Sequence, residues 1–150
     1  MKRKLIHAAG AVTLRGTGRP AIVFGARGPP ELLEHQVWLT ELELLLGVEF
    51  DREAKAGKAI PDGMFTRDGV TYAVEVDNCG KQSRKQYREK WIGYDGYDGD
   101  ILVATHTEER MRSVSAWIDV PRRSKCLFNT FERLVAGRPW QDWRGETTEL

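Results

Sequence analysis

Two short stretches rich in carboxylates lie near the middle of the chain. Asp62 follows Pro61, and after twelve intervening residues come Glu75, Val76 and Asp77. Carboxylates that converge repel one another unless a cation neutralises them. Carboxylate oxygens, a backbone carbonyl and water are ligands that magnesium and manganese prefer. If the fold brings the two stretches together, they predict a site for Mg2+ or Mn2+.

The residues around these acids predict how they would meet. Side chains alternate between the two faces of a strand, so Glu75 and Asp77 would point to the same side. Asp68 and Gly69 are a strong hairpin signal, and a turn there would fold Asp62 back beside Glu75. The alternative is an acidic strand face in solvent, with Asp62 capping a turn.

Hydrophobic periodicity and turn residues predict an α/β fold. The expected elements are a helix at Glu31–Leu46, strands at Val48–Glu53, Ala59–Thr66 and Val70–Val76, a helix at Gln82–Tyr94, a strand at Ile101–Ala104, a helix at Glu108–Trp117, a strand at Lys125–Thr130 and a helical turn to Ala136. Two short strands at Ala11–Leu14 and Ala21–Phe24 precede them. We expect a β-hairpin arm at residues 1–29 and one domain at residues 30–150.

The net charge of +1 hides an uneven distribution. Residues 1–30 carry six basic residues and no acidic one, whereas residues 31–78 hold eleven acids against four bases. A basic arm suits a polyanion such as DNA, and Arg15 and Arg19 are its candidate contacts. The alternative is a strand pair that covers a sheet edge or forms a homodimer.

The helix expected after the acids is strongly basic. Five cations crowd into ten residues, namely Lys81, Arg84, Lys85, Arg88 and Lys90. Helical spacing places Lys81, Lys85 and Arg88 on one face, where like charges destabilise a helix unless an anion neutralises them. The phosphates of DNA meet that need. A solvated helix face is the alternative.

The order of these motifs resembles that of a broad family and, within it, of a narrower one. Pro61 and Asp62 followed by Glu75, Val76 and Asp77, with a helix before and a basic helix after, resemble the signature of the PD-(D/E)XK nucleases. Over about residues 11–145 the chain is similar to the replication-relaxation family of plasmid and mobile-element proteins. The matching residues are His35, Pro61, Asp62, Gly63, Glu75, Val76, Asp77, Lys90, Tyr94, Ile101–Thr105 and Arg110. The resemblance implies a restriction-endonuclease-like αβββαβ mixed sheet flanked by helices, with an N-terminal hairpin like the wing of a winged helix.

The resemblance also implies roles for particular residues. Nucleases of this fold carry a lysine two residues after the second acid, and here that position is Asp77. Lys90 is the preferred substitute, with Lys81 and Lys85 as alternatives. In this scheme the residues have the following roles: Asp62, Glu75, the Val76 carbonyl and Glu41 hold Mg2+ or Mn2+, Asp77 orients or deprotonates water, and Lys90 stabilises the transition state.

We therefore expect a DNA-binding nuclease-like protein of a plasmid or mobile element, which hydrolyses phosphodiesters in connection with replication. One alternative is a non-catalytic DNA-binding replication or regulatory factor that keeps the fold. Another is an interaction module whose arm dimerises and whose acidic face binds a basic partner. Two cysteines without disulfide or zinc spacing, and no apolar run of about 20 residues, predict a soluble cytoplasmic protein without a membrane partner.

Overall fold

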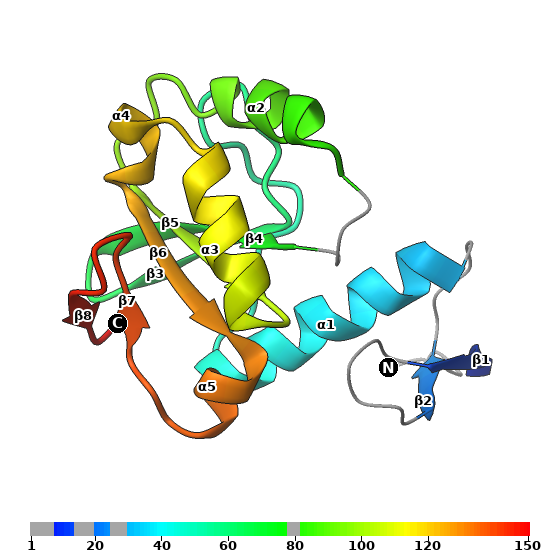
Figure 1. Ribbon diagram of the computed structural model, residues 1–150. Coiled ribbons are helices and arrows are strands. Elements are labelled where there is room, and N and C mark those ends of the chain that lie inside the picture. Colours follow the sequence, from blue (N-terminus) through cyan, green and yellow to red (C-terminus); the bar gives the residue numbers. More distant parts are fainter. Residues whose placement is uncertain (1–7, 14–19, 25–29, 78–81) are drawn as a thin grey trace. The chain divides into compact units, whose positions relative to one another are not determined.

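The computed structural model describes residues 8–13, 20–24, 30–77 and 82–150 (Figure 1). The chain divides into two units, Met1–Leu42 and Glu43–Leu150. This division falls inside a helix, and the predicted boundary between residues 29 and 30 stays a prediction. Within the described ranges, no helix is both long enough and apolar enough to cross a lipid bilayer.

The first unit contains a two-stranded antiparallel sheet. Strand β1 (Ala8–Thr13) pairs with β2 (Pro20–Phe24), and Thr13 stands opposite Pro20 in the register. Both strands were expected, although β1 begins earlier than the sequence pattern predicts. Arg15 and Arg19, the predicted DNA contacts, lie in the connection between the strands, outside the described residues. The likeness of this sheet to a wing stays a prediction.

Helix α1 (Pro30–Leu46) confirms the helix predicted at Glu31–Leu46, including its end at Leu46. Gly47 has a φ of 65°, a left-handed conformation that favours glycine. Its N–H donates to the Leu44 carbonyl, and the N–H of Val48 donates to the Glu43 carbonyl, both at 3.2 Å. These two bonds form a Schellman motif, which satisfies carbonyls that the last turn leaves without a helical partner.

The second unit is built on a six-stranded sheet with the order β3-β4-β5-β6-β7-β8. The strands are β3 (Gly63–Arg67), β4 (Val70–Val76), β5 (Asp100–Thr105), β6 (Cys126–Thr130), β7 (Trp140–Gln141) and β8 (Thr147–Thr148). β4, β5 and β6 are parallel, whereas β3, β7 and β8 pair antiparallel with their neighbours. This mixed sheet with its helices confirms the predicted α/β class.

The hairpin between β3 and β4 forms where the sequence places it. Arg67 stands opposite Val70, and the two residues between them, Asp68 and Gly69, have φ angles of 51° and 81°. Positive φ at both central residues is the geometry of the tight turn that Asp-Gly favours. The turn therefore sets the register that carries Asp62 toward the end of β4.

Four helices accompany the sheet of the second unit. They are α2 (Arg84–Ile92), α3 (Glu108–Trp117), α4 (Val120–Arg123) and α5 (Phe131–Val135). The bounds predicted for α3 are confirmed. Side chains of Ser83, Thr107 and Thr130 cap the first turns of α2, α3 and α5, which satisfies backbone N–H groups at those ends.

The strand predicted at Val48–Glu53 is wrong. In this segment only Asp51 pairs with a strand, through two backbone hydrogen bonds to Met64. The Asp51 carboxylate accepts hydrogen bonds from the backbone N–H groups of Glu53 and Ala54, so its own side chain turns the backbone away after one residue. Elements β7, β8 and α4 were not predicted, because such short segments carry no periodicity.

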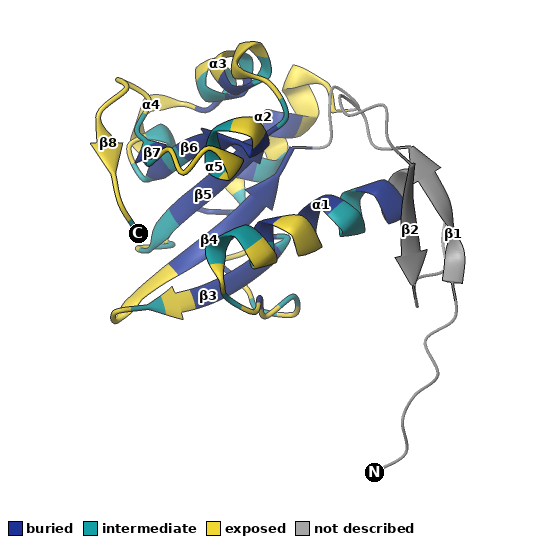
Figure 2. Ribbon diagram, turned by 90° about the horizontal axis from the view of Figure 1, so that it is seen from below, coloured by how far each residue is buried: buried dark blue, intermediate teal, exposed yellow. Residues whose placement is uncertain are grey.

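Helices α2 and α3 lie on one face of the sheet (Figure 1). Alternate strand residues such as Ala73, Ile101 and Phe128 pack there against Trp91 of α2 and Val114 of α3. Strands β4 and β5 are buried over most of their length (Figure 2). Central parallel strands are covered on both faces, so a charged residue placed in them needs a partner.

Candidate functional site

Asp62 is fixed to the end of β4 by two hydrogen bonds. Its backbone N–H donates to the Val74 carbonyl at 3.0 Å, and its carboxylate Oδ2 accepts from the Val76 N–H at 2.8 Å. Gly63 permits this approach, because a Cβ there would lie 2.7 Å from the Cβ of Phe50. The half-buried Asp62 carboxylate thus lies beside the segment that contains Glu75.

Glu75 is buried in the protein interior, with only 3% of its surface exposed. Two groups from the α2 region approach its carboxylate: Lys90 donates to Oε2, and the Tyr94 hydroxyl donates to Oε1 at 2.5 Å. Burial raises the pKa of Glu75 to about 7, and the charge of Asp62 adds to this rise, although Lys90 and Tyr94 lower it. Glu75 can therefore gain or lose a proton near neutral pH.

Lys90 is the only predicted catalytic lysine that the structure describes in contact with an acid of the site. Burial lowers the pKa of Lys90, but the attraction of Glu75, Asp62 and Asp77 outweighs it and raises the pKa overall. Lys90 is therefore a charged ammonium. Its side chain is still 28% exposed, so one part of it faces solvent.

Asp77 has different partners from those that the sequence suggests. Arg110 of α3 grips both carboxylate oxygens, with Nε to Oδ2 at 2.7 Å and Nη2 to Oδ1 at 2.9 Å. The Tyr87 hydroxyl donates to Oδ1 at 2.7 Å, and the Arg110 guanidinium lies 4.8 Å from the centre of the Trp117 ring. A buried carboxylate held by three hydrogen bonds is poorly placed to deprotonate water, and its geometry suits anchoring the end of β4 to α3.

The four side chains Asp62, Glu75, Lys90 and Tyr94 form what we call the acid–lysine cluster. Its donor set fits Mg2+ in kind, because this ion is commonly held by one or two carboxylates and several waters. The Val76 carbonyl is the third protein oxygen that the sequence predicts for this set, and the N–H of the same residue is bonded to Asp62. Among the described residues, no group of three or more His, Cys, Asp or Glu is placed to hold a metal ion. Any cation would therefore depend on two carboxylates, and one of them, Glu75, already accepts hydrogen bonds from Lys90 and Tyr94.

No contact with the cluster is described for the other predicted site residues, and some of them fall outside the described ranges. Glu41 is an exposed residue of α1, in the first unit. Arg84, Lys85 and Arg88 are exposed on α2, where Lys85 pairs with Glu89 at 3.9 Å. Lys81 lies outside the described residues, and α2 begins only at Arg84, so the helix face predicted to start at residue 81 is shorter.

Sequence reasoning gave no role to three groups that complete the site. The Tyr87 and Tyr94 hydroxyls bond Asp77 and Glu75, and Arg110 neutralises Asp77. A usable signal was present, since Tyr87 and Trp91 mark the buried side of α2, and Tyr94 follows just past its end at the same helical spacing. Aromatic residues with a hydroxyl on that side would meet the acids of β4.

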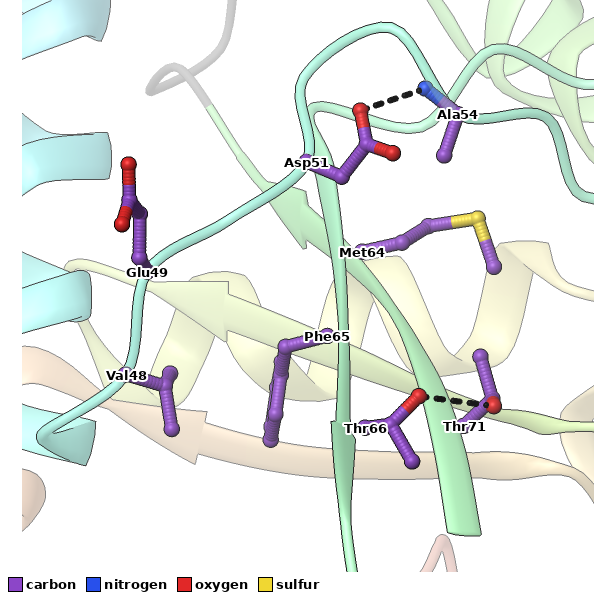
Figure 3. Close-up of a pocket in the computed structure, with 8 residues that line it drawn as sticks. All are labelled: Val48, Glu49, Asp51, Ala54, Met64, Phe65, Thr66 and Thr71. Carbon is purple, nitrogen blue, oxygen red and sulfur yellow. Dashed lines mark hydrogen bonds between the residues drawn. The ribbon is translucent and has the colours of Figure 1, made fainter. Parts of the chain in front are cut away.

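A groove of about 510 Å3 lies along the edge strand β3, lined by Val48, Glu49, Asp51, Ala54, Met64, Phe65, Thr66 and Thr71. It shares no residue with the acid–lysine cluster. Figure 3 shows two hydrogen bonds among its residues: Asp51 accepts from the Ala54 N–H, and Thr66 bonds Thr71. Charged groups meet in the acid–lysine cluster and not among these bonded pairs of the groove.

No protein-family model, curated protein or solved structure matches the chain. The class that the structure itself defines is an α/β protein with a six-stranded mixed sheet.

Proposed function

We propose that this protein binds DNA and hydrolyses its phosphodiester bonds with Mg2+ or Mn2+, on a restriction-endonuclease-like domain similar to those of the replication-relaxation family. The observation that carries the proposal is the contact of Lys90 with Glu75, beside Asp62. The nuclease signature needs two acids and a lysine, and the chain has Asp77 where the lysine is expected. α2 supplies a lysine to the same acids from another element.

The order of elements supports the same proposal. Helix α1 precedes the β3–β4 hairpin, α2 connects the parallel strands β4 and β5, and α3 connects β5 and β6. This order agrees with the αβββαβ pattern except that the first of the three strands is reduced to the pairing of Asp51 with Met64. The proposed place in a plasmid or mobile element, the proposed homodimer and the cytoplasmic location rest on the sequence.

The residues of the cluster divide the chemistry among them. Asp62, Glu75 and the Val76 carbonyl would hold the ion, which would polarise the phosphate and lower the pKa of a bound water. Lys90, once released from Glu75, would turn its ammonium toward the charge that develops on the phosphate. Tyr94 would keep its hydrogen bond to Glu75 and so hold that carboxylate in place while Lys90 moves.

Asp77 and Arg110 would act as positioning residues. Their ion pair fixes the residue after Val76 to α3, so the Val76 carbonyl and the Glu75 side chain keep their directions. This replaces the role of water activation that the sequence suggested for Asp77. The bound water would pass its proton to solvent or to a phosphate oxygen.

One observation favours a second candidate, a DNA-binding factor without catalysis. Both oxygens of Glu75 already accept hydrogen bonds from within the protein. A carboxylate satisfied in this way can stabilise the fold without a cation, and the basic residues of α2 could still bind DNA.

Cleavage of supercoiled plasmid by the purified protein tests the proposal. We expect nicked or linear product with Mg2+ or Mn2+, none with a chelator, and none from the double variant D62N/E75Q. K90M should lower the rate about 100-fold or more if Lys90 stabilises the transition state. K55M, which removes an exposed lysine of the same unit, is the matched control and should cleave at the normal rate.

Equal product from the wild type and D62N/E75Q would show that the cleavage comes from a contaminant, and the enzyme proposal would be wrong. Salt-sensitive DNA retention without metal-dependent cleavage would instead select the non-catalytic factor.

A further inference from the structure

A tight turn at residues 56–59 lies directly before the position at which Asp62 enters the acid–lysine cluster. Ala56 and Ala59 exchange two backbone hydrogen bonds across this turn, with N–H to carbonyl distances of 3.1 and 3.0 Å. Gly57, the first residue between them, has a φ of 65°, a left-handed conformation that glycine adopts without strain. We call this segment the 56–59 turn.

The 56–59 turn packs backbone against backbone on the residues that follow α2. The Lys58 N–H donates to the Gly93 carbonyl at 2.8 Å. A Cβ on Gly57 would lie 3.0 Å from the Asp95 carbonyl oxygen and 3.1 Å from that of Gly93. A Cβ on Gly93 would likewise lie 3.1 Å from the Cα of Ala59. Side-chain carbons do not normally approach so closely, so a methyl group on either glycine would push the two segments apart.

Gly93 stands between the two residues that donate to Glu75 from this part of the chain. Lys90 precedes it by one helical turn, and its carbonyl accepts the Gly93 N–H at 3.1 Å. Tyr94 is the next residue. Lys90 donates to Oε2 of Glu75 and Tyr94 to Oε1, whereas Glu75 itself belongs to β4. A shift of the backbone at Gly93 would therefore move both donors relative to the carboxylate.

We infer that the 56–59 turn positions the acid–lysine cluster, with Gly57 and Lys58 as positioning residues. The turn joins the chain that enters Asp62 to the segment that carries Lys90 and Tyr94, and so sets the spacing between the acids and their donors. Its importance for cleavage rests on the proposed function. Misplacement of a catalytic group by about 1 Å can lower a rate about 100-fold, so a shift of a few tenths of an ångström should cost about 4- to 10-fold.

The test follows the hydrogen bond between Tyr94 and Glu75 by NMR in the full chain. The four tyrosines, labelled with carbon-13 at the ring carbon that carries the hydroxyl, give one signal each, and Y94F assigns the signal of Tyr94. We expect G57A to shift this signal, although the two positions are far apart in the sequence. A loss of stability alone does not move a signal of the folded protein.

K58P is the second variant, and it decides the question if G57A does not fold. Proline has no N–H, and its ring carbon would take the place of the hydrogen that the Gly93 carbonyl accepts. The ring would therefore push the same two segments apart without a change at Gly57. K58P should also shift the Tyr94 signal.

G137A is the matched control for G57A. Gly137 has a φ of 67°, and in the described part of the chain no atom lies within 4 Å of the position that a Cβ would take. G137A therefore carries the same left-handed strain without pressing on a neighbour. It should lower the thermal midpoint but leave the Tyr94 signal at its wild-type position.

Cleavage of supercoiled plasmid supplies the second readout. G57A should lower kcat about 4- to 10-fold and leave the affinity for DNA unchanged, because the exposed basic residues of α2 are still present. G137A should keep the wild-type kcat.

A Tyr94 signal that stays at its wild-type position in folded G57A or K58P would overturn the inference. An equal shift in G137A would overturn it too, because strain alone would then explain the effect. Absence of cleavage by the wild type would instead overturn the proposed function, and the Tyr94 signal would still decide whether the 56–59 turn positions the cluster.

Discussion

Replacement of Arg110 by alanine should destabilise the protein strongly, because it would leave the buried carboxylate of Asp77 without its counterion. Asp77 is 4% exposed, and Arg110 donates two of the three hydrogen bonds that hold its carboxylate. Removal of one partner from a buried ion pair costs about 3 to 5 kcal/mol. For a unit of this size, that loss lowers the midpoint of thermal unfolding by about 12 °C or more.

Urea unfolding followed by tryptophan fluorescence measures this loss of free energy. R112A is the control on the same helix and should change the unfolding free energy by less than about 0.5 kcal/mol, as exposed substitutions usually do. The double variant D77N/R110A completes a mutant cycle. Since D77N removes the charge that R110A would leave unpaired, the double variant should be clearly more stable than the sum of the two losses predicts.

Two results would refute this reasoning. One is a loss below about 1 kcal/mol for R110A, which would mean that other groups or water solvate Asp77 without Arg110. The other is an additive cycle, which would mean that the two side chains do not interact.

Two further predictions concern the neighbouring residues. The pKa of Glu75 is raised by burial from 4.5 to about 7, so the folded chain binds this proton more tightly than the unfolded chain. The resulting stabilisation is complete below about pH 4.5, declines as the pH rises through 7, and amounts to at most about 3 kcal/mol. The difference in unfolding free energy between wild type and E75Q should follow this decline, whereas parallel pH curves would contradict it. G63A should cost about 1 to 3 kcal/mol, because the new methyl group overlaps Phe50. An unchanged thermal midpoint for G63A would show that Phe50 moves aside freely.

Local signals in the sequence predicted much of the fold. The Asp68-Gly69 turn, the end of α1 at Gly47 and the bounds of α3 depend on residues close together in the chain, and all three agree with the structure. The strand prediction at Val48–Glu53 was wrong for a local reason too. Its apolar and acidic residues suit a strand, but hydrogen bonds of the Asp51 side chain to the next backbone N–H groups compete with strand pairing.

The partners of the acids could be predicted only in part. Alternation places Glu75 and Asp77 on one face, but it does not say which cation reaches each of them. Lys90 of α2 lies fifteen residues after Glu75, and Arg110 of α3 lies thirty-three residues after Asp77. Only the packing of these two helices on the sheet selects them as partners. The lysine and arginine residues of α2 look alike in sequence, although among the described ones only Lys90 contacts an acid of the cluster.

The most direct test of the acid–lysine cluster is a crystal structure of the protein soaked in Mn2+, with anomalous diffraction data collected to locate the ion. The proposal predicts an anomalous peak bound by the carboxylates of Asp62 and Glu75, with the Lys90 ammonium moved away from Glu75. If the soaked crystal shows no anomalous peak at these carboxylates and Lys90 is still bonded to Glu75, the proposal is contradicted. Lys90 is then a structural counterion of Glu75.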